Sequence, residues 1–140
     1  MRHLIAMTWL ALGPLGVYAD ESWKEEVRVH ASVPRKSVEA AIAAVDAALT
    51  PFGYRRDTGP RPHPLDLLRD LLAIYEAGTY ADASVFEGTR PGCLDIFISY
   101  YDRARSGSAD AARKSVELEL RKSLGSRVRF YSDARCEHAL

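Results

Sequence analysis

Hydrophobic and polar residues alternate in several stretches of the chain, most clearly over residues 25–33. There Val27, Val29, Ala31 and Val33 occupy every second position, and the residues between them are charged or polar. Side chains two residues apart lie on the same face of a strand, so the pattern predicts a strand with one buried face. Further strands are predicted at residues 79–87, 93–101 and 126–132. Residues 88–92 are expected to join the strands 79–87 and 93–101 as a hairpin connection.

Three other segments have hydrophobic residues at helical spacing. A helix is predicted from Pro34 to Leu49, where Thr50-Pro51 ends it, and another over residues 109–124, closed by Gly125. A third helix is predicted at residues 65–77, because two apolar stripes run along it; their members are Leu65, Leu68, Leu72 and Tyr75, and Leu67, Leu71 and Ile74. The Pro- and Gly-rich residues 58–64 before it are expected to form a connector.

This order of elements predicts an α+β protein. Two split β-α-β units joined by a hairpin would form a ferredoxin-like two-layer sandwich. We expect a four-stranded antiparallel sheet in the order 4-1-3-2, two main helices on one face, and one inserted helix. A fold of this kind hosts many unrelated functions, so it assigns none by itself.

The composition is that of a single folded domain. The chain has 140 residues, of which 47% are hydrophobic and 27% charged, which argues against a disordered chain. Its formal net charge is +0, so it lacks the overall positive charge of many nucleic-acid-binding proteins. Strand 93–101 also lacks the basic opening of the common RNA-binding sheet, and no nucleic-acid partner is expected.

The N-terminus has the pattern of a signal peptide. Arg2 and His3 precede an apolar run over residues 4–17, and Ala19 follows at a position suited to cleavage. A retained membrane anchor is the alternative, but Gly13-Pro14 interrupts the run and a spanning helix needs about 20 residues. We therefore expect residues 1–19 to be removed and residues 20–140 to form one periplasmic or secreted domain without a stable membrane anchor.

Export determines how the two cysteines are interpreted. Thiols in an oxidising compartment tend to pair, so a Cys93–Cys136 disulfide is predicted. The alternatives are a reactive thiol or a metal site with His30, His63 or His138, although no metal-ligand spacing is present.

The predicted topology conflicts with that disulfide. It places Cys93 at the start of the third strand and Cys136 beyond the end of the parallel fourth strand. The tail from Ser132 to Cys136 would then cover only about half the height of the sheet at about 3.3 Å per residue. Either the last strand is shorter than predicted, the topology differs, or the disulfide is absent.

The sheet face turned away from the helices is the candidate binding surface. Aromatic and arginine side chains of this kind are enriched at protein interfaces. The face is expected to carry Arg28, His30, Tyr80, Asp82, Phe86, Asp95, Phe97, Tyr101, Arg127, Arg129 and Tyr131. Among them Arg28, Phe97, Tyr101, Arg129 and Tyr131 are the predicted binding residues. The alternatives are that helix 65–77 covers this face or that the face forms a homodimer.

Catalysis is the weaker hypothesis. His30 and Asp95 share the parity of this face, so Asp95 could orient the imidazole as a base. Asp82, Glu87 and Ser99 are further candidate groups, but no nucleophile elbow, zinc motif, phosphate loop or dinucleotide fingerprint accompanies them. The sequence therefore predicts an exported binding module for a protein or small ligand, with inhibitor and immunity proteins as possible forms. No cofactor is expected. A small hydrolase and a structural homodimer are the alternatives.

Overall fold

A computed structural model describes residues 23–58, 70–133 and 136. The predicted signal peptide, the connector from residue 59 and the first part of the predicted inserted helix, residues 65–69, lie outside these residues.

Within the described residues, six strands form one antiparallel sheet in the order β2-β3-β4-β5-β1-β6. The strands are β1 (Glu25–Ser32), β2 (Arg55–Arg56), β3 (Asp70–Ala77), β4 (Ala81–Glu87), β5 (Cys93–Tyr100) and β6 (Arg129–Tyr131). The predicted four-stranded ferredoxin-like sandwich is therefore wrong, because β2 and β3 extend the sheet beyond β4. The protein is an α+β fold with a wider sheet than the sequence pattern predicted.

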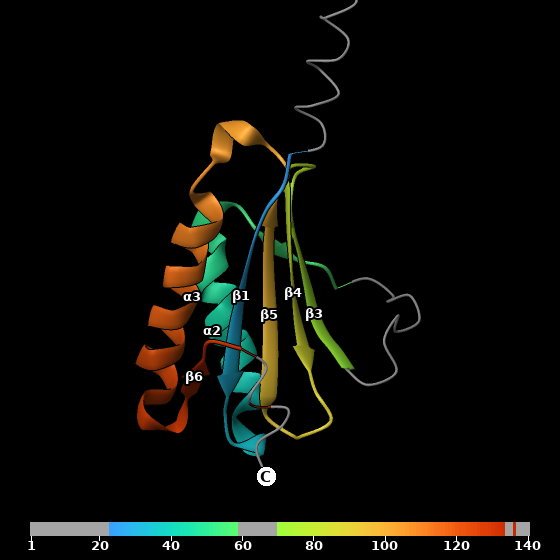
Figure 1. Cartoon of the computed structure of the whole chain (residues 1–140). Helices are drawn as coiled ribbons and strands as arrows, with labels where there is room; N and C mark the ends of the chain where they lie inside the picture. Colours follow the sequence, from blue (N-terminus) through green and yellow to red (C-terminus); the bar gives the residue numbers. More distant parts are fainter. Residues whose placement is uncertain (1–22, 59–69, 134–135, 137–140) are drawn as a thin grey trace, which may run out of the picture.

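Two helices pack side by side on one face of the sheet, α2 (Val38–Leu49) and α3 (Ser108–Leu124) (Figure 1). Short 3-10 turns flank them at Arg35–Ser37, Thr50–Phe52, Arg103–Arg105 and Gly125–Arg127. Each helix buries an apolar stripe, which is Ala41, Ala44, Val45, Ala48 and Leu49 in α2 and Ala109, Ala112, Val116, Leu120 and Leu124 in α3. These stripes meet the inner face of the sheet, where the core lies.

The inner face follows the predicted alternation along the two central strands. Val29 and Ala31 of β1 are buried, as are Leu94, Ile96 and Ile98 of β5. Because successive side chains of a strand point to opposite faces, the residues between them lie on the outer face.

The predicted helix over residues 65–77 is wrong where the structure describes it, because residues 70–77 form β3. Ala73, Tyr75 and Ala77 are buried on the inner face, whereas Leu71 and Ile74 are half-buried. The apolar residues on both faces mask the alternation, and the register shifts between Leu71 and Ala73. No described element at this position covers the sheet as the predicted helix would have done.

Asp46 of α2 holds the two additional strands against the helices. Its carboxylate accepts hydrogen bonds from the Tyr75 hydroxyl of β3 and from the Arg56 guanidinium of β2, whose Nε lies 3.0 Å from Oδ1. Burial, followed by this hydrogen bond, raises the pKa of Tyr75 above its usual range, so the phenol stays protonated. One helix side chain therefore satisfies a buried hydroxyl and a surface cation.

Asp46→Ala is expected to lower the free energy of unfolding by roughly 2 kcal/mol, because it leaves the buried Tyr75 hydroxyl without this acceptor. Tyr75→Phe should cost less, about 1 kcal/mol. It removes the hydroxyl itself, and the Asp46 carboxylate still accepts hydrogen bonds from Arg56. Urea unfolding measures both. Glu39→Ala, an exposed acid on the same helix, is the control. Equal losses for Asp46→Ala and Glu39→Ala would show that the Asp46 contacts do not stabilise the fold.

Candidate binding face

The outer face of the sheet is the face turned away from α2 and α3 (Figure 1). Strand register brings its residues into rows that cross the strands. Arg28 of β1 lies opposite Phe97 of β5, and His30 lies opposite Asp95. On the far side of β5, Asp95 is opposite Phe86 of β4. No helix in the described part of the chain covers these rows.

Arg28, Phe97 and Phe86 form one cluster, called here the Arg28–Phe97 cluster. The guanidinium carbon of Arg28 lies 4.4 Å from the centre of the Phe97 ring, which is cation–π geometry. The Phe86 ring meets Phe97 edge to face, with centroids 5.7 Å apart. Arg28 is exposed and both rings are half-buried. Phe86 was not among the predicted binding residues, although its parity in strand 79–87 placed it on this face.

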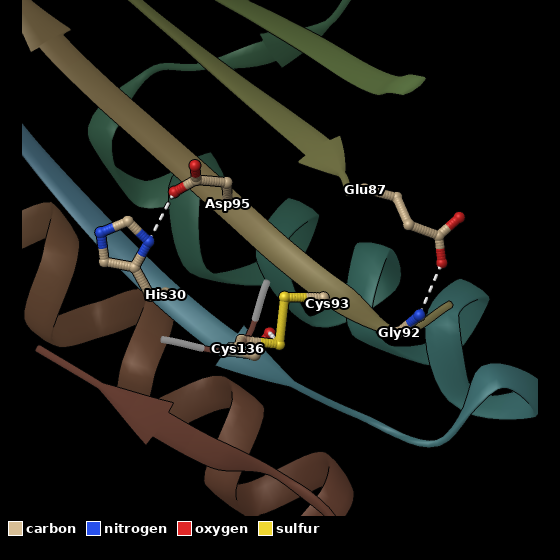
Figure 2. Close-up of a disulfide and its surroundings, with 7 residues drawn as sticks. His30, Glu87, Gly92, Cys93, Asp95 and Cys136 are labelled. Atoms are coloured by element: carbon tan, nitrogen blue, oxygen red, sulfur yellow. Dashed lines mark hydrogen bonds and ion pairs between the residues drawn. A yellow bond between two sulfur atoms is a disulfide. The ribbon is translucent and has the colours of Figure 1, made fainter. Parts of the chain in front are cut away.

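His30 and Asp95 form a close pair in the neighbouring row. Figure 2 shows the imidazole facing the carboxylate, with Nδ1 of His30 2.7 Å from Oδ1 of Asp95. Each side chain is only 12% exposed. The carboxylate lies beside Nδ1, and Nε2 is on the side of the ring away from Asp95. Asp95 therefore fixes the orientation of the ring.

The other candidate groups for catalysis lie away from that pair. Ser99 is four residues further along β5 than Asp95, about 13 Å at 3.3 Å per residue, which is outside hydrogen-bond reach of His30. Asp82 accepts a hydrogen bond from the Tyr101 hydroxyl at 3.0 Å. Glu87 accepts one from the Gly92 amide at 2.8 Å in the β4–β5 connection. The structure thus brings His30 and Asp95 together but leaves the Ser99 hydroxyl out of reach of His30.

The other predicted binding residues lie around the cluster. Tyr101 follows β5 and is 39% exposed, with its hydroxyl bound to Asp82. On β6, Tyr131 is opposite His30 and Arg129 is opposite Ser32.

Tyr80 and Arg127 do not lie on the outer face as predicted. Tyr80 is in the turn before β4, where its ring stacks on the buried Tyr100 and lies 3.7 Å from the Arg105 guanidinium. Arg127 belongs to the 3-10 turn after α3 and donates to the Leu124 carbonyl. Both residues precede the strand in which they were placed, because β4 and β6 begin later than the sequence pattern predicted.

Cys93 and Cys136 form a disulfide, which confirms the predicted pairing; their Cα atoms are 5.8 Å apart (Figure 2). The geometric conflict disappears because β6 is only three residues long and ends at Tyr131. The Cys136 Sγ lies 4.0 Å from the Ala31 carbonyl of β1. Cys93 has the same parity along β5 as Asp95, so the disulfide is at one end of the outer face.

A separate cavity of about 450 Å³ lies between the start of α2, the start of β3 and the β4–β5 connection. Its lining residues are Arg35, Val38, Glu39, Asp70, Glu87, Gly88, Thr89 and Pro91. None of them belongs to the Arg28–Phe97 cluster or the His30–Asp95 pair. Within the described residues, no group of three or more His, Cys, Asp or Glu side chains is arranged to hold a metal ion. His63 and His138 lie outside the described residues.

Comparisons with protein-family models and with curated proteins give no match. In the described part of the chain, no helix has the length and apolar character needed to cross a membrane.

Replacing both cysteines, as Cys93→Ser with Cys136→Ser, should lower the free energy of unfolding by roughly 4 kcal/mol, the chain-entropy value for a loop of this length. The disulfide joins residues 43 positions apart and therefore restricts much of the unfolded chain. Urea unfolding of the oxidised, reduced and double-serine proteins measures the loss. Alkylation of the oxidised protein should label no thiol, and two labelled thiols would contradict the pairing.

Proposed function

We propose that this chain is an exported binding module whose partner is a protein that docks on the outer face of the sheet. The observation that carries the proposal is the Arg28–Phe97 cluster, an exposed arginine stacked on a half-buried ring. Arginine and aromatic side chains supply much of the binding energy at protein interfaces, because each buries a large area and a guanidinium also donates several hydrogen bonds.

The shape of the face favours a protein over a small ligand. Small molecules usually bind in concave sites that enclose most of their surface. The described cavity of about 450 Å³ is lined by the start of α2 and the β4–β5 connection and includes no residue of the Arg28–Phe97 cluster. A sheet face on which exposed Arg28 lies over half-buried Phe97 suits a broad contact with another protein.

Two features support export. The apolar N-terminal run with its charged start has the features of a signal peptide. The Cys93–Cys136 disulfide is typical of proteins in oxidising compartments, and both cysteines are buried. A periplasmic or secreted location accounts for both.

Expression of residues 1–140 in a Gram-negative host should yield a mature protein that begins at Asp20. Signal peptidase recognises the small Ala19 after the apolar run, and Asp20 would become the first residue. Intact mass of the protein from the periplasmic fraction measures the cleavage. An Ala19→Arg variant, which blocks the cleavage position, should retain the leader. A wild-type chain that still begins at Met1 in the cytosol would contradict export.

Capture from the exported fraction of the source organism should recover the partner with wild-type protein and lose it with Arg28→Ala/Phe97→Ala. Truncation of an interface hot spot costs about 2 kcal/mol or more, so the double variant should bind at least 30-fold more weakly. Lys114→Ala on α3 is the control, because this exposed side chain lies on the opposite side of the molecule. Thermal unfolding checks that each variant is folded.

Equal recovery by the double variant and the wild type would refute the outer face as the binding surface. Recovery of this chain alone, together with a dimer in sedimentation, would instead favour the structural homodimer. Turnover of an ester or peptide that His30→Ala abolishes would favour the hydrolase.

A further inference from the structure

We infer that the Arg28–Phe97 cluster recognises a carboxylate that lies next to an apolar side chain, in an acidic segment of a partner protein. The inference rests on the proposed function, since it specifies what the outer face binds.

The acidic side chains around Arg28 already have other partners. Along β1, Glu26 pairs with Lys24 at 3.6 Å. In the adjacent row, Asp95 pairs with His30 at 2.7 Å. Asp82, in the row of Glu26, accepts the Tyr101 hydroxyl at 3.0 Å. Among the described residues, no acid forms an ion pair with Arg28, so its charge is available to an incoming anion.

Stacking on Phe97 prepares Arg28 for that anion. A guanidinium that lies over a ring uses its flat face in the contact, and its N–H groups point outward from its edge. Those groups match the two oxygens of a carboxylate in a bidentate arrangement. Phe97 thus restricts the side chain before the partner arrives, which lowers the entropy cost of binding.

The neighbouring residues supply an apolar contact on one side of Arg28. Phe97 and Phe86 meet edge to face, and Ser84, a small residue, separates Phe97 from Ile74 in the same row. Phe97, Phe86 and Ile74 are all half-buried. A carboxylate bound at Arg28 therefore places the adjacent residue of the partner over apolar surface. This combination favours Asp or Glu beside an aromatic or aliphatic residue.

The test uses two blocked peptides that differ only in charge, N-acetyl-Phe-Glu-amide and N-acetyl-Phe-Gln-amide. Titration is followed by NMR of the isotope-labelled protein, at the Arg28 side-chain N–H and the Phe97 ring. The Glu peptide should bind at least tenfold more tightly than the Gln peptide, and added salt should reduce the difference.

Arg28→Gln should remove the preference for the Glu peptide. Arg90→Gln is the matched control, because it removes the same charge from an exposed arginine in the β4–β5 connection that is not among the candidate binding residues. It should leave the preference intact. Phe97→Leu keeps an apolar residue but removes the ring, so it should weaken both peptides. Backbone spectra of each variant establish that the fold is unchanged.

The inference is overturned if both peptides bind equally, if neither binds at millimolar concentration, or if the preference survives Arg28→Gln. One of these results can occur while Arg28→Ala/Phe97→Ala still loses the captured protein. In that case the binding-module proposal stands, and only the inference that the cluster recognises a carboxylate is wrong. If capture is also unaffected by the double variant, the proposed function fails as well.

Discussion

The pairing of β5 between β4 and β1 is the constraint on which the rest of the structure depends. β5 is the most buried strand of the sheet, and Phe97 is its one half-buried residue. Its inward residues, Leu94, Ile96 and Ile98, form the centre of the core. The same register sends Asp95 and Phe97 to the outer face. A slip of one residue would exchange the two sets, so core packing also fixes the candidate site.

Much of the fold could be predicted because each central element has a clear period. Strand β1 alternates strictly, and helices α2 and α3 end close to Pro51 and Gly125, as local chemistry requires. β3 could not be predicted in this way, since Leu71, Leu72 and Ile74 give it apolar residues on both faces and these also fit a helix. Its conformation depends on pairing with β4 and on the distant Asp46, neither of which is visible in a local pattern.

The outer face was predictable only where the strand boundaries were correct. Parity along β1 and β5 placed Arg28 and Phe97 on one face, and their cross-strand pairing brings them into contact. Tyr80 and Arg127 were assigned to the wrong face, because they lie in turns and side chains alternate between two faces only within a strand. Phe86 became significant only through the β4–β5 register, which a single sequence does not reveal.

The contacts that anchor the two ends of β1 do not involve Arg28, the central residue of the proposed binding surface. At one end of β1, the Glu25 carboxylate accepts hydrogen bonds from the Gly107 and Ala109 amides, where the helix dipole of α3 favours a negative charge. At the other end, the disulfide at Cys93 ties the C-terminal segment to β5. The exposed Arg28 lies between these anchors and belongs to neither. A binding residue that does not hold the fold together can change with its partner, because its replacement costs the protein little stability.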